Sequence, residues 1–76
     1  MNHAQTAKII KDLCEKNNIT IESMLKICGI RSSLIYDLEK RHFTPSSELL
    51  ETIAIYFGCS VDYLLGRTDN PNINKW

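Results

Sequence analysis

The sequence predicts an all-α fold in which five short helices form one compact domain. Apolar side chains recur three and four residues apart in five successive segments, as they do along one face of a helix. No run alternates apolar and polar residues for long enough to indicate a strand. Thr20, Gly29 and Gly58, which lie between segments, are residue types that begin or end helices. A chain of 76 residues, 43% of them hydrophobic, forms one domain with a modest core.

The first two helices are predicted from their apolar faces and their caps. Residues 7–14 carry apolar side chains at helical spacing, and this helix ends near Asn17-Asn18, because asparagine tolerates the left-handed conformation. Thr20 supplies an N-cap for a second helix over residues 21–28. Gly29 ends the second helix, since a tight turn often needs a positive φ.

The third helix, over about residues 32–40, has two chemically different faces. The apolar face carries Leu34, Ile35 and Leu38. The opposite face carries Ser32, Ser33, Tyr36 and Asp37. We expect the apolar face to enter the core and the polar face to remain available for binding.

The last two helices follow residues that favour helix starts. The segment 44–47 begins the fourth helix, with Pro45 in its first turn, and Gly58 ends it. Ser60 caps a brief fifth helix, which Gly66 closes.

The chain divides into a helical domain and a tail. Residues 67–76 contain an Asn-Pro-Asn turn signal and show no helical period. We therefore expect the domain to span residues 1–66 and residues 67–76 to form a C-terminal tail or linker.

Charge is distributed unevenly along a chain whose net charge is zero. A sequence pI near 6.7 argues, by itself, against a strongly cationic nucleic-acid-binding protein. Residues 26–42, however, carry a net charge of +2, whereas residues 43–66 carry −3. The middle of the chain is therefore basic and the following segment acidic.

Several classes of protein are disfavoured. Cys14, Cys28 and Cys59 are odd in number and widely spaced, so we expect reduced thiols and neither a disulfide framework nor a metal site. The longest stretch without a charged residue, 52–61, is shorter than the roughly 20 residues that span a membrane, and the N-terminus lacks a secretory pattern. We expect a cytoplasmic protein.

Catalysis is also disfavoured. The Cys and His residues show no nucleophile-base motif, and the sequence contains no glycine-rich phosphate loop. We expect no enzyme activity, no cofactor and no small-molecule ligand.

Four segments carry a resemblance to a known family. They read NITIESMLKICGI, SSLIYDLEK, TPSSELLETIAIYFGCS and SVDYLLGRTDNP, within about residues 7–71. They resemble the lambda-repressor/Cro type of helix-turn-helix DNA-binding domain, also called the xenobiotic-response-element family. The resemblance implies a lambda-repressor-like five-helix fold and a bacterial or phage transcription regulator, of repressor or Cro type, that binds an operator in double-stranded DNA.

The resemblance also implies how the third helix meets DNA. Helix 32–40 would lie in the major groove as the recognition helix. Its base-reading positions are Ser32, Ser33, Tyr36 and Asp37. Asp37 would accept a hydrogen bond from a cytosine amino group, or would instead pair with Arg41 one turn further on. The DNA backbone would be contacted by Thr20, Arg31, Lys40, Arg41, His42 and Thr44.

The sequence departs from the family pattern at Ile21, where the family usually has Gln, and at Leu25, where it prefers Ala. Arg41 replaces a common Gly, which suggests a different loop after the third helix.

A further departure concerns Glu39, whose usual partner in the family is an Arg on the first helix. That position is Cys14 here, so we expect Glu39 to face solvent or to pair with Lys11 or Lys40.

We expect a homodimer, at least on DNA, since one helix reads too few base pairs to select an operator. The expected contact residues are Ile55, Tyr63, Leu64 and Trp76, with Leu64 equally compatible with the core.

The alternative function is a protein-interaction module, such as a helix-turn-helix antitoxin or anti-regulator, which would use similar apolar surfaces and which the neutral net charge slightly favours.

Overall fold

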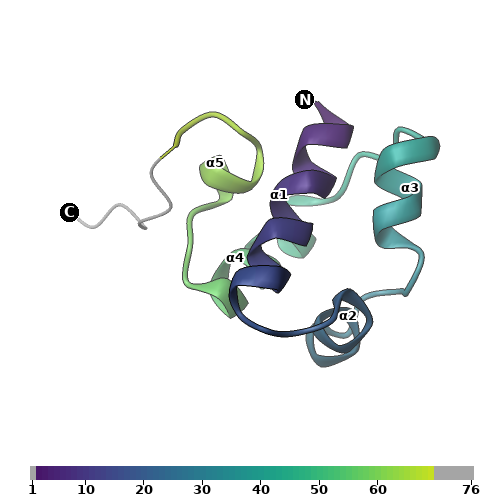
Figure 1. The fold of residues 1–76 in the computed structure, drawn as a ribbon. Coiled ribbons are helices and arrows are strands. Elements are labelled where there is room, and N and C mark those ends of the chain that lie inside the picture. Colours follow the sequence, from purple (N-terminus) through teal and green to yellow (C-terminus); the bar gives the residue numbers. More distant parts are fainter. Residues whose placement is uncertain (1, 70–76) are drawn as a thin grey trace.

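The computed structural model describes residues 2–69 and contains five helices (Figure 1). They are α1 (His3–Lys16), α2 (Ile21–Cys28), α3 (Leu34–Lys40), α4 (Ser47–Phe57) and α5 (Val61–Leu64). No strand occurs within residues 2–69, so the prediction of an all-α, five-helix fold is confirmed. Helix α1 lies between α3 and α5 and contacts α2 as well (Figure 1).

Short-range capping interactions explain where the helices start. The hydroxyl oxygens of Thr20, Ser46 and Ser60 each accept a hydrogen bond from the backbone N–H three residues further along. The predicted caps at Thr20 and Ser60 are thus confirmed. The prediction that Pro45 lies in the first turn of α4 was wrong. The helix begins after Ser46, because the Ser46 hydroxyl accepts a hydrogen bond from a backbone N–H of the first turn. Pro45 precedes this cap and is buried.

The helix ends also follow local chemistry. Gly29 and Gly58 adopt left-handed conformations with φ of 70° and 69°, and their N–H groups bond to carbonyls of the last turn. After α1, the left-handed residue is Asn18, with φ of 53°. These predicted endings are confirmed to within a residue.

The core is built from apolar side chains of all five helices. The largest fully buried ones include Ile10, Met24, Leu25, Leu34, Leu38, Ile53 and Leu64. Of the two roles predicted for Leu64, the core is confirmed and the dimer contact was wrong, because its side chain is 0% exposed. Leu64, with the half-buried Val61, Tyr63 and Leu65, packs α5 on the core, which leaves no Leu64 surface for a partner.

The cysteines and the hydropathy of the helices complete the description of the fold. Cys14 and Cys59 are buried, Cys28 is half-buried, and all three thiols are free. Burial raises the pKa of each thiol, most simply because the charged thiolate loses hydration inside the domain. None of the helices between residues 2 and 69 is long and apolar enough to cross a membrane.

Candidate nucleic-acid interface

Helices α2 and α3 form a helix-turn-helix unit at one edge of the molecule (Figure 1). The turn between them is fixed by two backbone hydrogen bonds, from Ile30 N to Leu25 O and from Leu34 N to Arg31 O. Ser32 and Ser33 belong to this turn, so α3 begins two residues later than the predicted 32–40. The apolar face of α3 packs on α1, which leaves its outer face exposed.

The exposed face of α3 and the turn before it hold three of the predicted base-reading residues. Ser32 and Ser33 are exposed, and the Tyr36 side chain is 56% exposed. The Ser33 hydroxyl donates a hydrogen bond to Asp37 Oδ2 at 3.1 Å instead of capping the helix. Its oxygen can still accept from a ligand, but its proton is already engaged.

Asp37 is not on the exposed face, and this corrects its expected role as a base reader. The residue is only 6% exposed. Its Oδ2 lies 3.1 Å from Arg31 Nε, and its Oδ1 lies 3.9 Å from Arg41 Nε. A buried carboxylate is costly unless it is paired, which explains why it turns toward the arginines. Pairing with Arg41 was predicted as the alternative, whereas the closer partner, Arg31, was missed.

Two aromatic rings lie beside these arginines. The guanidinium carbon of Arg31 lies 4.4 Å from the centroid of the Phe43 ring, and that of Arg41 lies 5.8 Å from the centroid of Tyr36. Phe43 was not among the predicted site residues. The signal that was available is an aromatic residue directly after the basic segment 40–42.

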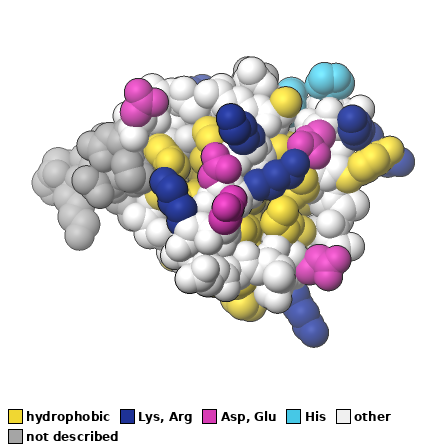
Figure 2. All heavy atoms as spheres, in the orientation of Figure 1, with side chains coloured by type: hydrophobic (Ala, Val, Ile, Leu, Met, Phe, Trp, Pro, Cys, Tyr) yellow, Lys and Arg dark blue, Asp and Glu magenta, His cyan; other side chains and the backbone are white. Residues whose placement is uncertain are grey.

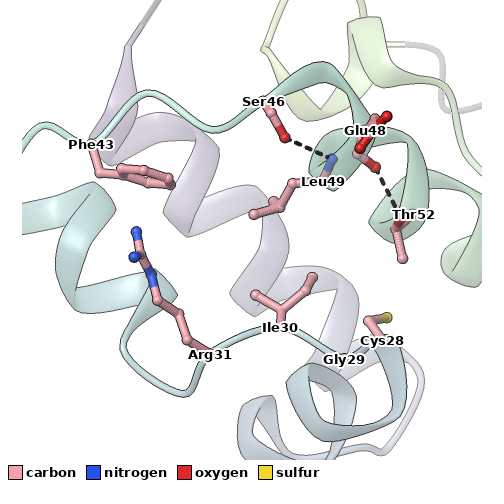
Figure 3. Close-up of a pocket in the computed structure, with 9 residues that line it drawn as sticks. All are labelled: Cys28, Gly29, Ile30, Arg31, Phe43, Ser46, Glu48, Leu49 and Thr52. Atoms are coloured by element: carbon pink, nitrogen blue, oxygen red, sulfur yellow. Dashed lines mark hydrogen bonds between the residues drawn. The ribbon is translucent and has the colours of Figure 1, made fainter.

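An open hollow of about 450 Å³ lies between the turn after α2 and the start of α4 (Figure 3). Ile30, Phe43 and Leu49 supply apolar parts of its wall, and the guanidinium of Arg31 extends toward Phe43. Ser46, Glu48 and Thr52 supply polar parts of its wall, but the hydroxyls of Ser46 and Thr52 already bond backbone groups of α4, and we assign the hollow no ligand.

The loop after α3 is tied to the start of α1. His3 Nε2 lies 3.1 Å from Thr44 Oγ1, and the rings of His3 and His42 meet edge to face with centroids 5.7 Å apart. His42 adopts φ of 51°, so the loop takes its left-handed residue one position after Arg41. The predicted backbone-contacting residues His42 and Thr44 are thereby brought together with His3, which sequence reasoning missed.

The second carboxylate of α3 is also paired. Lys11 Nζ lies 2.7 Å from Glu39 Oε2, which joins α1 to α3. Of the three arrangements predicted for Glu39, the structure adopts the one with Lys11.

Basic side chains therefore gather around α3, whose own carboxylates, Asp37 and Glu39, are paired, while Glu22 on α2 is exposed. Arg31, Lys40 and Arg41 are exposed, as are Thr20 and His42. Figure 2 shows Lys, Arg and His side chains together over the end of α3. Within the described residues, no group of three or more potential metal ligands occurs.

The fold and this edge define a helix-turn-helix protein. A family model for helix-turn-helix domains matches residues 10–64, which extend from α1 to the end of α5. The chain belongs to this Cro/C1-type helix-turn-helix family, whose members are DNA-binding regulatory domains and not enzymes. No curated protein and no solved structure matches the chain.

Proposed function

We propose that the protein is a bacterial or phage transcription regulator that binds a specific operator in double-stranded DNA through α3. The observation that carries this proposal is the pairing of both α3 carboxylates, Asp37 and Glu39, with basic side chains. Unpaired, they would repel phosphate. Paired, they leave an edge on which hydroxyls and cations face outward together, as groove binding requires.

The proposed roles follow from exposure. Ser32, Ser33 and Tyr36 contact base edges in the major groove, with Ser33 acting as an acceptor. The residues proposed to contact the DNA backbone are Thr20, Arg31, Lys40, Arg41, His42 and Thr44. These contacts fix the orientation of α3 without reading sequence.

We also propose a homodimer on DNA, formed by the surface of α4 and α5. Ile55 is 75% exposed on α4, and Tyr63 is half-buried on α5. Trp76, the remaining expected contact residue, lies outside the described residues. Two copies would place their recognition helices on half-sites about 34–36 Å apart.

The direct test is a titration with double-stranded DNA of mixed sequence at several salt concentrations, followed by selection of bound sites from a random pool. We expect affinity to fall steeply with salt, and the selected sites to share a two-fold symmetric sequence. Native mass spectrometry of the selected complex should give two chains per duplex, and one chain after Ile55→Asp. Absence of salt-dependent binding would overturn DNA binding and favour a protein-interaction module instead.

A further inference from the structure

We propose that Asp37 is a positioning residue, which holds Arg31 and Arg41 in place to bind DNA phosphates. This inference rests on the proposed function. Asp37 is the carboxylate on α3 that is almost completely buried, and positioning the arginines takes the place of the base-reading role that the sequence predicted for it.

The two arginines reach Asp37 from opposite ends of α3. Arg31 lies in the turn before the helix, and Arg41 lies directly after it. Both approach the carboxylate with Nε, Arg31 at 3.1 Å and Arg41 at 3.9 Å, which is an ion-pair distance longer than a hydrogen bond. A guanidinium held through Nε keeps its two terminal nitrogens available, and these are the groups that bond phosphate oxygens in pairs. The side chains of Arg31 and Arg41 remain 53% and 72% exposed, so those nitrogens are accessible to a ligand.

Further contacts restrict the same groups. The Ser33 hydroxyl donates to Asp37 Oδ2, and the Asp37 carbonyl accepts from the backbone N–H groups of Arg41 and Phe43. The Phe43 ring in turn lies beside the guanidinium of Arg31. The carboxylate, its two arginines and the loop after α3 therefore form one connected unit. A side chain that is already ordered loses less conformational entropy when it binds.

This arrangement predicts that removing the negative charge of Asp37 lowers the affinity for DNA, which is the opposite of the usual effect. Removing a negative charge from a surface that faces DNA normally tightens binding, because repulsion from phosphate falls. If Asp37 positions the arginines, Asp37→Asn weakens binding instead. We expect about a tenfold loss of affinity for mixed-sequence duplex DNA, which is the size of a lost charge-assisted contact.

Glu39→Gln is the matched control, because it removes the same charge from the same helix but leaves both arginines in place. We expect its affinity to be unchanged or slightly higher. Circular dichroism and thermal unfolding verify that each variant is folded.

A double-mutant cycle separates positioning from a general structural role. In an Arg31→Gln/Arg41→Gln background, Asp37→Asn should no longer weaken binding and should leave DNA affinity unchanged or slightly higher, because the groups that it positions are gone. If Asp37→Asn unfolds the domain, the Arg31→Lys variant is measured in its place. Arg31→Lys keeps the charge but loses the planar, paired donors, and we expect about threefold weaker binding to all duplexes.

Tighter or unchanged DNA binding by a folded Asp37→Asn variant would overturn the inference. So would an equal loss of affinity when Asp37→Asn is made in the Arg31→Gln/Arg41→Gln background. If Asp37→Asn does not fold, unchanged binding by Arg31→Lys would overturn it. A change of preference at one base pair, with mixed-sequence affinity intact, would overturn it too and return Asp37 to base reading. If the unaltered protein binds no duplex with salt dependence, the proposed function fails first.

Discussion

The edge formed by α3 and the surface formed by α4 and α5 differ in the charges that they expose. At the α3 edge, carboxylates are paired and cations are exposed. On α4, Glu48 and Glu51 are exposed and have no ion-pair partner within residues 2–69, and Ile55 faces outward. Under the proposed function, this asymmetry would orient the domain on a polyanion, with the first region toward it, despite a net charge of zero.

The largest expected effect tests how the α4–α5 region is held. Leu64→Ala should lower the free energy of unfolding by about 2–5 kcal/mol, because it leaves a cavity where a fully buried side chain packs. Ile55→Ala, on the exposed side of the same region, should change it by less than about 0.5 kcal/mol. Urea unfolding measures both. Equal losses would show that Ile55 is covered in solution.

The next effect tests whether the two regions differ toward DNA. Lys40→Ala should weaken binding to all duplexes several-fold and reduce the salt slope by about one unit, as expected for one lost phosphate contact. Arg67→Ala removes an exposed cation just after α5, which pairs with Asp62 at 3.8 Å, and should leave affinity unchanged. Filter binding at several salt concentrations compares the two, and equal losses would remove the distinction between the regions.

A smaller effect concerns pH. Burial raises the pKa of the Cys59 thiol, which lies between α4 and α5. The unfolded chain then loses this proton at lower pH than the folded chain, so stability is full below the ordinary thiol pKa and declines as pH rises above it. We expect Cys59→Ala to flatten this alkaline decline in thermal unfolding curves. An unchanged pH profile would mean that Cys59 does not contribute.

The smallest effect concerns the ion pair that joins α1 to α3. Lys11→Met should cost less than about 1 kcal/mol, because both partners are partly exposed and solvent screens their attraction. Chemical denaturation at low and high salt measures it. A much larger loss would mean that this pair holds α3 in place.

The sequence by itself determined the features that depend on neighbouring residues. The number and order of the helices, the caps at Thr20 and Ser60, and the left-handed glycine at position 29 all arise from interactions within a few residues. The apolar periodicity also identified most of the core, because burial repeats with the turn of the helix. Family membership followed from the same local segments.

Only the tertiary structure decided which side chains far apart in the sequence, or lying in turns, come into contact. Leu64 belongs to the core because α5 packs on the rest of the domain, and a four-residue helix carries too little periodicity to show this. Lys11 pairs with Glu39 across 28 positions of the chain. Asp37 turns inward toward Arg31 because a turn, not a helix, brings that arginine close. Ion pairing depends on where side chains end in space, and only the packing of α3 against the domain sets those positions.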